Sequence, residues 1–283
     1  MSSPSLASDP SGKAGRQLTP FLKWAGGKRW LVANYGNLFP RDFGRYVEPF
    51  LGGGSVFFYL QPENSFLTDA NERLIETYTE IRDDWGGVYD LLQRHQWLHS
   101  KEHYYHERKR CHRSPVQRAA QFIYLNRTCW NGLYRVNIKG FFNVPIGTKS
   151  SVLLNTDNFS AISYTLKNTD LIAQDFAATM ADLGEGDFLY VDPPYTVNHK
   201  YNGFLKYNER IFSWQDQIRL RDCVVRSFNN GAKIAVSNAD HESIRELYAG
   251  VGEFVSLRRS SLIAGSSERR GSVHELLILL CRS

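Results

Sequence analysis

The sequence of 283 residues contains little cysteine and no paired cysteine motif. Its four cysteines are Cys111, Cys129, Cys223 and Cys281, and no two of them form a Cys-x-x-Cys pair. This spacing gives no basis for a disulfide framework or a zinc ribbon, so we expect all four thiols to be reduced.

Long hydrophobic runs are also absent. The longest apolar runs, 56–60 and 276–281, have the length of a strand or a short helix, whereas a membrane-spanning helix needs about 20 apolar residues. Residues 1–19 are rich in Ser, Pro and Gly and lack the apolar segment of a signal peptide, which predicts a disordered leader. We therefore expect a cytoplasmic protein without a membrane partner.

The net charge is only +5, but the charges are unevenly distributed. Residues 101–150 contain ten Lys or Arg and two Glu, a local charge of +8, whereas residues 61–90 contain eight acidic and two basic residues. A basic block on a nearly neutral protein is typical of a polyanion-binding segment. A solvated helix surface is the alternative explanation.

Short apolar runs that end in loops predict an α/β fold, interrupted by a helical, basic insert. The predicted strands are 45–47, 65–67, 171–173 and 188–191 (the last two buried), 234–236, 254–257 and 276–280, and the predicted helices are 55–60, 74–85, 213–229 and 243–248. The apolar face of helix 74–85 ends in Trp85.

Two further elements are predicted inside the insert. Ser114, Pro115 and Gln117 are typical of a capping box and a first-turn proline, and the helix that follows should bury one face. Asn-Gly and Lys-Gly pairs between residues 130 and 145 predict a loop and a β-hairpin.

The tetrapeptide Asp192-Pro193-Pro194-Tyr195 directly follows the predicted strand 188–191. Two prolines end the strand and expose its polar groups at the carboxyl edge of the sheet, where open α/β sheets bind ligands. A carboxylate and a backbone carbonyl can accept hydrogen bonds from an exocyclic amine while the Tyr ring stacks on the base, which suits methylation of an amine. A rigid turn is the alternative explanation.

Two other motifs are candidates for a ligand site. Residues 48–55 (EPFLGGGS) join a predicted strand and helix, and Asp69 ends the next strand. Glycines let backbone approach a ligand closely, and an acid at that position can bind ribose hydroxyls, although a tight turn would also explain the glycines. In residues 20–28, Trp24 and Lys28 could bracket a carboxylate or a base, or Trp24 could belong to the core.

Six segments follow one another in order between residues 21 and 280, namely FLKWAGGK, EPFLGGGSVF, TDAN, LNRxxxNGLYRVNxKGxFNVPxG, DPPY, and RRS followed by ELL. Together they resemble the Dam-type DNA adenine-N6 methyltransferases, an alpha-class, D12-type family. The resemblance implies a Rossmann-like methyltransferase fold with a mixed sheet, S-adenosyl-L-methionine as cofactor and double-stranded DNA as partner. The catalytic domain would comprise 20–71 and 165–283, and a helical and β-hairpin target-recognition insert would comprise 72–164.

The resemblance also implies roles for individual residues. Those that hold a flipped adenine for catalysis would be Asp192, Pro193 and Tyr195. Those that bind the cofactor would be Trp24, Lys28, Phe50, Leu51, Gly52, Gly53, Gly54, Ser55, Asp69, Asp175, Phe176, Asp192 and Tyr201. Those that bind DNA would be Lys23, Arg110, Arg113, Trp130, Asn131, Leu133, Arg135, Asn137, Pro145, Arg258, Arg259 and Arg269.

The sequence leaves several alternatives open. His95, His99 and His103 have helical spacing, but no HExxH motif accompanies them and nearby Arg and Lys repel cations, so we expect no metal. We predict a monomer or weak dimer that methylates adenine N6, with GATC as the first target to test. A cytosine-N4 methyltransferase and a DNA-binding module with a vestigial site are the alternatives. Restriction-modification, replication or repair marking and phage protection are equally compatible with the motifs.

Overall fold

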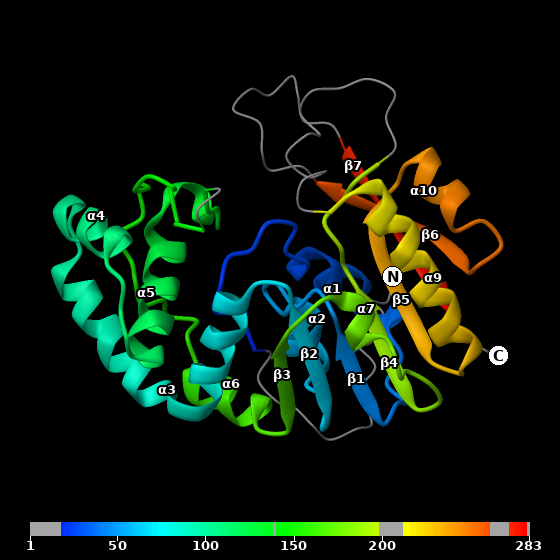
Figure 1. The fold of residues 1–283 in the computed structure, drawn as a ribbon, viewed down its shortest axis with the longest axis horizontal. Helices are drawn as coiled ribbons and strands as arrows, with labels where there is room; N and C mark the ends of the chain where they lie inside the picture. Colours follow the sequence, from blue (N-terminus) through cyan, green and yellow to red (C-terminus); the bar gives the residue numbers. More distant parts are fainter. Residues whose placement is uncertain (1–17, 138–139, 198–211, 261–271, 282–283) are drawn as a thin grey trace, which may run out of the picture.

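The computed structural model describes residues 18–137, 140–197, 212–260 and 272–281 (Figure 1). Its centre is a seven-stranded sheet in the order β3-β2-β1-β4-β5-β7-β6. Strands β1 to β5 are parallel, and β7 runs antiparallel to both of its neighbours, which confirms the expected mixed, Rossmann-like sheet. The strands are β1 (Arg45–Glu48), β2 (Ser65–Asp69), β3 (Thr169–Ala173), β4 (Asp187–Val191), β5 (Lys233–Ala239), β6 (Glu253–Ser260) and β7 (Ser272–Leu280).

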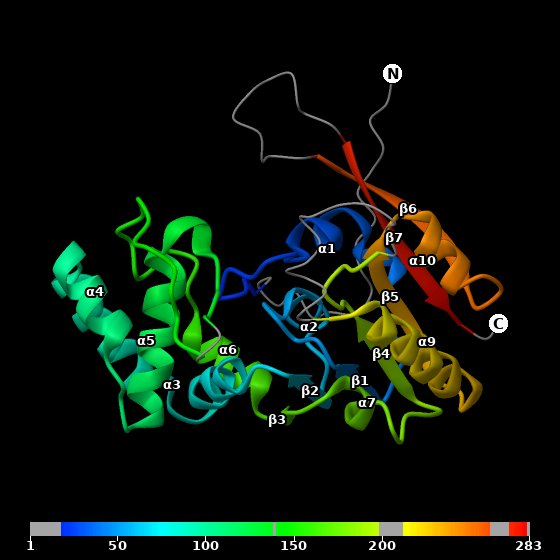
Figure 2. The ribbon, with the colours of Figure 1, turned by 45° about the horizontal axis from the view of Figure 1, so that its top comes forward.

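Helices cover the sheet, and a group of them extends beyond its β3 edge (Figures 1 and 2). The helices are α1 (Arg29–Tyr35), α2 (Ser55–Leu60), α3 (Glu72–Leu98), α4 (Lys101–Lys109), α5 (Pro115–Thr128), α6 (Phe159–Leu166), α7 (Phe176–Thr179), α9 (Trp214–Asn229) and α10 (Glu242–Leu247), with short 3-10 helices over Gly36–Leu38 and Trp130–Gly132. In the described part of the chain, no helix is long and apolar enough to cross a membrane.

The two faces of the sheet belong to different cores because successive strand residues point in opposite directions. In β4, Phe188 and Tyr190 join the core beneath α1, α2 and α3, whereas Leu189 and Val191 join the core beneath α9 and α10. The first of these cores continues without a break into α5 and α6. The predicted domain boundaries at residues 71 and 165 do not separate two cores, because one buried cluster crosses them. The division into a catalytic and a target-recognition part therefore remains a prediction about function.

Two sequence-based expectations about burial are wrong. Strand β3 is predicted to be buried, but it is the edge strand, so Leu171 is half-buried and Ile172 is 45% exposed. Trp85 is predicted on the buried face of its helix, but it is 39% exposed. The backbone of α3 leaves helical geometry at Asp84 (φ −144°, ψ 55°), which changes the direction of the residues that follow.

The insert also differs in detail from its prediction. Helix α5 begins at Pro115 as expected, but Ser114 makes no capping hydrogen bond, and proline itself has no N–H that would require one. Every residue from 119 to 128 is buried, so α5 is enclosed on all sides rather than on one face. In the segment 130–145, called the 130–145 loop below, the predicted hairpin is short. Val136 and Phe142 form an antiparallel bridge, and flanking backbone hydrogen bonds join Asn137 to Phe141 and Asn143 to Arg135.

The sheet order places the predicted motifs at one edge. The chain leaves β1 toward β2 and leaves β4 toward β5, and these two connections lie on opposite sides of the β1–β4 pair. Ligands of open α/β sheets bind at the carboxyl ends of strands where the order reverses in this way. Because Glu48 ends β1 and Val191 ends β4, the motifs 48–55 and 192–195 both begin at this edge.

Candidate active site and DNA interface

Side chains from three separate segments meet where β4 ends. The Nζ atom of Lys28 lies 2.8 Å from Oδ1 of Asp192 and 3.6 Å from Oε2 of Glu275. The hydroxyl of Tyr195 donates a hydrogen bond of 2.8 Å to the same oxygen of Glu275. The Lys28 ammonium also lies 4.8 Å from the centre of the Tyr195 ring, and Lys28 is only 3% exposed. The motifs 20–28 and 192–195 therefore form one polar cluster.

The charges in this cluster oppose one another. Burial raises the pKa of Asp192 above its ordinary value, and the neighbouring ammonium of Lys28 counteracts that rise. Burial raises the pKa of Tyr195 well above its ordinary value, and the carboxylates of Asp192 and Glu275 raise it further. Tyr195 therefore stays protonated at neutral pH and donates its hydrogen bond to Glu275.

Two buried carboxylates lacked an assigned role in the sequence motifs. Glu275 is the charged residue at the start of the apolar segment 275–280, and such an isolated acid in a strand is the signal that could have identified it. Glu48 is 2% exposed and accepts a hydrogen bond of 2.8 Å from the hydroxyl of Tyr46. Burial raises the pKa of Glu48 well above its ordinary value.

The glycine loop 52–54 is tied to Asp69 and to Trp24. The backbone N–H of Gly52 donates to Oδ2 of Asp69 at 3.1 Å, and that of Asn71 donates to Oδ1 at 3.0 Å. Gly52 has a φ of +47°, and a Cβ atom there would lie 2.6 Å from Cδ1 of Trp24. Only glycine allows both this conformation and this close approach of the indole.

The other predicted cofactor residues of the glycine motif lie between β1 and the start of α2. Leu51 is 2% exposed and Ser55 is 8% exposed at the start of α2. A Cβ atom on Gly53 would touch Cβ of Trp24 at 3.4 Å, and Gly54 has a φ of +64°. Tyr201 lies outside the described residues.

The predicted adenine-flanking residues have local partners. The rings of Phe50 and Phe176 stack with their centres 5.4 Å apart and an interplanar angle of 28°. Asp175 is exposed, caps the first turn of α7 and forms an ion pair of 2.8 Å with Arg219. The structure thus brings Phe50 and Phe176 together, and it directs the Asp175 carboxylate toward α9.

Asn126 and Arg127 of α5 hold the segment 20–28 against the insert. The N–H of Lys23 donates to Oδ1 of Asn126 at 2.9 Å, and Nδ2 of Asn126 donates back to the Lys23 carbonyl at 2.8 Å. Arg127 donates to the Phe21 carbonyl at 2.9 Å and forms a buried ion pair with Asp157. The Leu-Asn-Arg segment of α5 belongs to a sequence motif but had no predicted role. In the structure it joins that motif to the motif 20–28.

The predicted DNA-binding residues of the 130–145 loop are all exposed. Trp130 is 54% exposed and Leu133 is 39% exposed. The remaining exposed candidates are Asn131, Arg135, Asn137 and Pro145. These candidates are therefore all accessible to solvent on one loop.

Lys23 lies beside the same loop. A Cβ atom on Gly132 would lie 2.5 Å from Cδ of Lys23, so the two segments touch. Burial and the neighbouring ammonium of Lys149 lower the pKa of Lys23 to about 8. Two ammonium groups that repel each other mark a position where an anionic group would be favourable.

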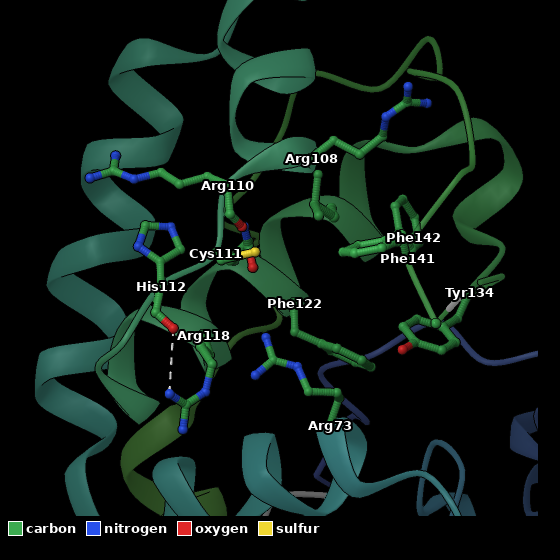
Figure 3. A pocket seen from close by; sticks show the side chains of 13 residues that line it. Arg73, Arg108, Arg110, Cys111, His112, Arg118, Phe122, Tyr134, Phe141 and Phe142 are labelled. Carbon is green, nitrogen blue, oxygen red and sulfur yellow. Dashed lines mark hydrogen bonds between the residues drawn. The ribbon is translucent and has the colours of Figure 1, made fainter. Parts of the chain in front are cut away.

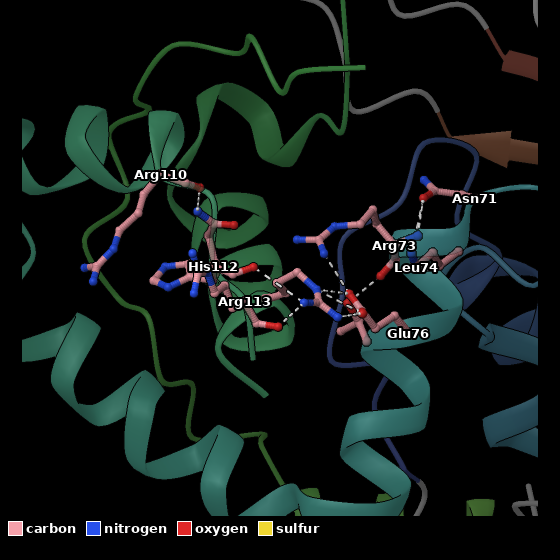
Figure 4. A network of polar contacts seen from close by, with 10 residues as sticks. Asn71, Arg73, Leu74, Glu76, Arg110, His112 and Arg113 are labelled. Carbon is pink, nitrogen blue, oxygen red and sulfur yellow. Dashed lines mark hydrogen bonds and ion pairs between the residues drawn. The ribbon is translucent and has the colours of Figure 1, made fainter. Parts of the chain in front are cut away.

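Arginines and aromatic rings line a cavity of about 250 Å³ between α3, α5 and the 130–145 loop (Figure 3). Two of these arginines share one carboxylate, because Glu76 accepts hydrogen bonds from Arg73 at 2.7 Å and from Arg118 at 2.9 Å (Figure 4). Arg110 is 51% exposed and lies 3.3 Å from a buried glutamate, and Arg113 is exposed. The predicted phosphate contacts are thus on the surface, whereas the Glu76 network joins α3 to α5.

The two predicted arginines of β6 have different surroundings. Arg258 is exposed and pairs in register with His274 of β7. The guanidinium of Arg259 lies 3.2 Å from Oε1 of Glu275 and 5.8 Å from the centre of the Trp30 ring. Arg259 therefore belongs to the Glu275 cluster in this structure. Arg269 lies outside the described residues.

The histidines with helical spacing contact each other and an aromatic ring. Nδ1 of His95 lies 3.0 Å from Nε2 of His103, and Nδ1 of His99 lies 3.0 Å from the Tyr124 hydroxyl. Burial lowers the pKa of His95 to about 4, so this side chain is neutral. Across residues 18–137, 140–197, 212–260 and 272–281, no three His, Cys, Asp or Glu side chains are grouped so that they could hold a metal ion. The zinc alternative therefore finds no site in these segments.

Comparisons with known proteins identify the family of this chain. The model of the D12 class N6 adenine-specific DNA methyltransferase family matches residues 24–261. The chain is 34% identical over 270 residues to the Type II methyltransferase M1.LlaDCHI of Lactococcus lactis subsp. cremoris, which covers 92% of this chain and 95% of that protein.

Two further relatives match with similar coverage. Over 286 residues the chain is 34% identical to the Type II methyltransferase M.MjaIII of Methanocaldococcus jannaschii, with 93% of this chain and 99% of that protein covered. It is 30% identical over 267 residues to a DNA adenine methylase of Haemophilus influenzae, with 92% and 93% covered. Since both the family model and these relatives span most of its length, the chain belongs to the D12 class N6 adenine-specific DNA methyltransferase family.

Proposed function

We propose that this enzyme transfers a methyl group from S-adenosyl-L-methionine to N6 of an adenine flipped out of double-stranded DNA, with GATC as the first target sequence to test. The observation that supports the proposal most strongly is the cluster at the carboxyl end of β4. There the acceptor Asp192 and the ring of Tyr195 lie beside the buried ammonium of Lys28.

The glycine loop and its neighbours fit the proposed cofactor. Gly52 and Gly54 have positive φ, and the backbone of this loop would approach the cofactor without side chains between them. Asp69 would accept hydrogen bonds from ribose hydroxyls, and Phe50 and Phe176 would flank the adenine ring. When bound, S-adenosyl-L-methionine supplies a methyl group on a positively charged sulfur, which makes that methyl group electrophilic.

Residues after β4 would prepare the target amine. The Asp192 carboxylate and the Pro193 carbonyl would accept hydrogen bonds from the N–H groups of the amine. These hydrogen bonds would direct the nitrogen lone pair toward the methyl group and stabilise the positive charge that develops on the nitrogen. The ring of Tyr195, fixed by its hydrogen bond to Glu275, offers a flat surface to the base. The ammonium of Lys28 would form ion pairs with both Asp192 and the carboxylate of the cofactor.

The exposed insert would recognise the duplex. Arg135 can donate two hydrogen bonds to a guanine edge, and Leu133 can contact a thymine methyl group. Arg110 and Arg113 would contact phosphates, which adds affinity without sequence information. The target base must leave the helical stack to reach Asp192, because its amine is inaccessible inside the duplex.

On this proposal, residues 20–71 and 165–283 bind the cofactor and carry out transfer, and residues 72–164 read the target. The protein would act as a monomer or weak dimer on DNA in the cytoplasm of a bacterial or phage-infected cell. An endonuclease gene beside the gene for this protein would favour a role in restriction-modification.

A labelling experiment tests the proposed function. The protein is incubated with methyl-labelled S-adenosyl-L-methionine and two duplexes that differ only in the presence of GATC, and the nucleosides are then separated. We expect label on adenine N6 in the GATC duplex alone. Label on cytosine, or no label in either duplex, overturns the reaction, and equal labelling of both duplexes overturns the proposed target.

Two matched variants test the role of the carboxylate. Asp192→Ala should abolish transfer and leave DNA binding largely intact, because it removes a contact to the flipped amine and none to the rest of the duplex. Asp222→Ala removes a carboxylate that is 61% exposed on α9, and it should keep full activity. Loss of both transfer and DNA binding in Asp192→Ala would indicate a role in folding.

A further inference from the structure

We infer that Tyr134 is a positioning residue that makes cofactor binding and DNA binding depend on each other, an inference that rests on the proposed function. Tyr134 lies in the 130–145 loop between the exposed residues Leu133 and Arg135, but its own ring is half-buried. No sequence motif assigned it a role. Figure 3 shows the ring at the end of the arginine-lined cavity, close to Phe122.

The first connection runs through an aromatic stack. The rings of Tyr134 and Trp24 are stacked with centres 5.3 Å apart and an interplanar angle of 21°. Trp24 in turn packs so closely on Gly52 that a Cβ atom there would lie 2.6 Å from the indole. A single side chain therefore separates the 130–145 loop from the glycine loop.

The second connection runs through Asn71 and Asp69. Burial raises the pKa of Tyr134, and the neighbouring amide side chain of Asn71 counteracts part of that rise. The backbone N–H of Asn71 donates to Oδ1 of Asp69 at 3.0 Å, and Oδ2 of Asp69 accepts from Gly52 at 3.1 Å. Both connections thus end at Gly52, in the loop proposed to bind the cofactor.

Packing around the ring makes it move with its loop. Tyr134 contacts Phe122 with ring centres 4.8 Å apart and Phe142 with ring centres 5.8 Å apart. The residues on either side, Leu133 and Arg135, are proposed to contact bases. A closely packed cluster resists gradual deformation, so a shift of these residues on DNA binding must be accommodated through the ring of Tyr134. The same ring must follow when a ligand repositions the glycine loop.

Calorimetry of a non-reactive ligand measures this dependence. The affinity of S-adenosyl-L-homocysteine is determined for the protein alone and for the protein saturated with a GATC duplex. For the wild type we expect DNA to raise this affinity about fivefold or more, which is the lower end of typical coupling between sites. The affinity for the duplex should change by the same factor when the ligand is present, because coupling of binding is reciprocal.

Three variants connect the effect to Tyr134. Tyr134→Leu removes the ring and should bring the ratio of affinities close to one. Tyr134→Phe keeps the stack and loses the hydroxyl, so its ratio shows how much the Asn71 connection contributes and also tests the inference if Tyr134→Leu does not fold. Tyr164→Leu makes the same exchange at a residue of α6 that is 79% exposed, and it should keep the wild-type ratio.

The outcomes separate this inference from the proposed function. A wild-type ratio of one overturns the inference, and so does a wild-type ratio in a folded Tyr134→Leu variant. If only Tyr134→Phe folds and it keeps the wild-type ratio, the Asn71 connection is overturned, and a wild-type ratio in Trp24→Leu then overturns the stacked connection as well. If the enzyme methylates DNA but the ratios overturn the inference, the proposed function still stands. If the enzyme transfers no methyl group, the proposed function itself is contradicted.

Discussion

The ammonium of Lys28 lies 2.8 Å from a carboxylate oxygen of Asp192, and Glu275 approaches the same ammonium at 3.6 Å. Burial has the largest influence on the pKa of Asp192 and raises it, Lys28 lowers it and Glu275 raises it. Two neighbours of opposite charge therefore adjust the protonation of the proposed acceptor in opposite directions.

This arrangement predicts opposite pH shifts for two variants. Asp192 must be ionised to accept a hydrogen bond from the amine, so activity falls as the pH decreases through the pKa of Asp192. Glu275→Gln removes a negative neighbour and lowers that pKa, which should move the acid limb of kcat/KM to lower pH. Lys28→Gln removes the positive neighbour and should move it to higher pH. Profiles measured at saturating cofactor check both, and shifts in the same direction would contradict the assignment.

The buried pair of Arg127 and Asp157 should be important for stability. Their side chains are 2% and 8% exposed, and Arg127 also bonds the Phe21 carbonyl. Arg127→Ala leaves a buried carboxylate without its partner, which should lower the free energy of unfolding by about 3 to 5 kcal/mol. Urea denaturation at unchanged m-value measures this loss.

The control for that measurement is another arginine–aspartate pair. Arg219 and Asp175 are 45% and 50% exposed, so Arg219→Ala should cost about 1 kcal/mol or less. Equal losses for Arg127→Ala and Arg219→Ala would show that burial of the first pair is unimportant.

Arg135 and Arg113 should affect DNA binding in different ways. Arg135→Ala should reduce discrimination against a changed base pair by about 1 to 3 kcal/mol, because it removes a contact to a base edge. Arg113→Ala should weaken binding to all sequences equally and reduce the slope of log K against log salt by about 0.9, because it removes one phosphate contact. Titrations of GATC and altered duplexes at several salt concentrations distinguish these results, and an unchanged sequence preference in Arg135→Ala contradicts its role.

Stability should decrease in mild acid because of His95. Burial lowers its pKa to about 4 from an ordinary value of 6.5, so the unfolded chain binds the proton more readily. The free energy of unfolding should begin to fall below about pH 6.5 and lose up to about 3 kcal/mol by about pH 4. His95→Gln should remove this part of the pH dependence in denaturant titrations. His106→Gln, at a side chain that is 64% exposed, should retain it.

Much of the secondary structure was predictable from local pattern. Strand β4 and the turn at Asp192 follow from an apolar run and two prolines, and α9 begins at the capping box of Ser213 and Asp216. These features depend on residues close together in the chain. The exposure of β3 and of Trp85 was not predictable, because it depends on the position of a strand in the sheet and on the backbone at Asp84.

The candidate site shows the same division. The order of the motifs identified Lys28, Asp69, Asp192 and Tyr195 as candidates, and the family model confirms the family that these motifs indicated. The sequence by itself therefore determined the family, the strand positions, about half of the helices and most candidate residues, whereas α1, α4, α6 and α7 were not predicted. Only the tertiary structure decided that Glu275 holds Tyr195, that Arg259 pairs with Glu275, and that Tyr134 stacks on Trp24. These partners come from β7, β6 and the insert, and they meet only because buried strands and rings from distant segments must pack together to exclude water.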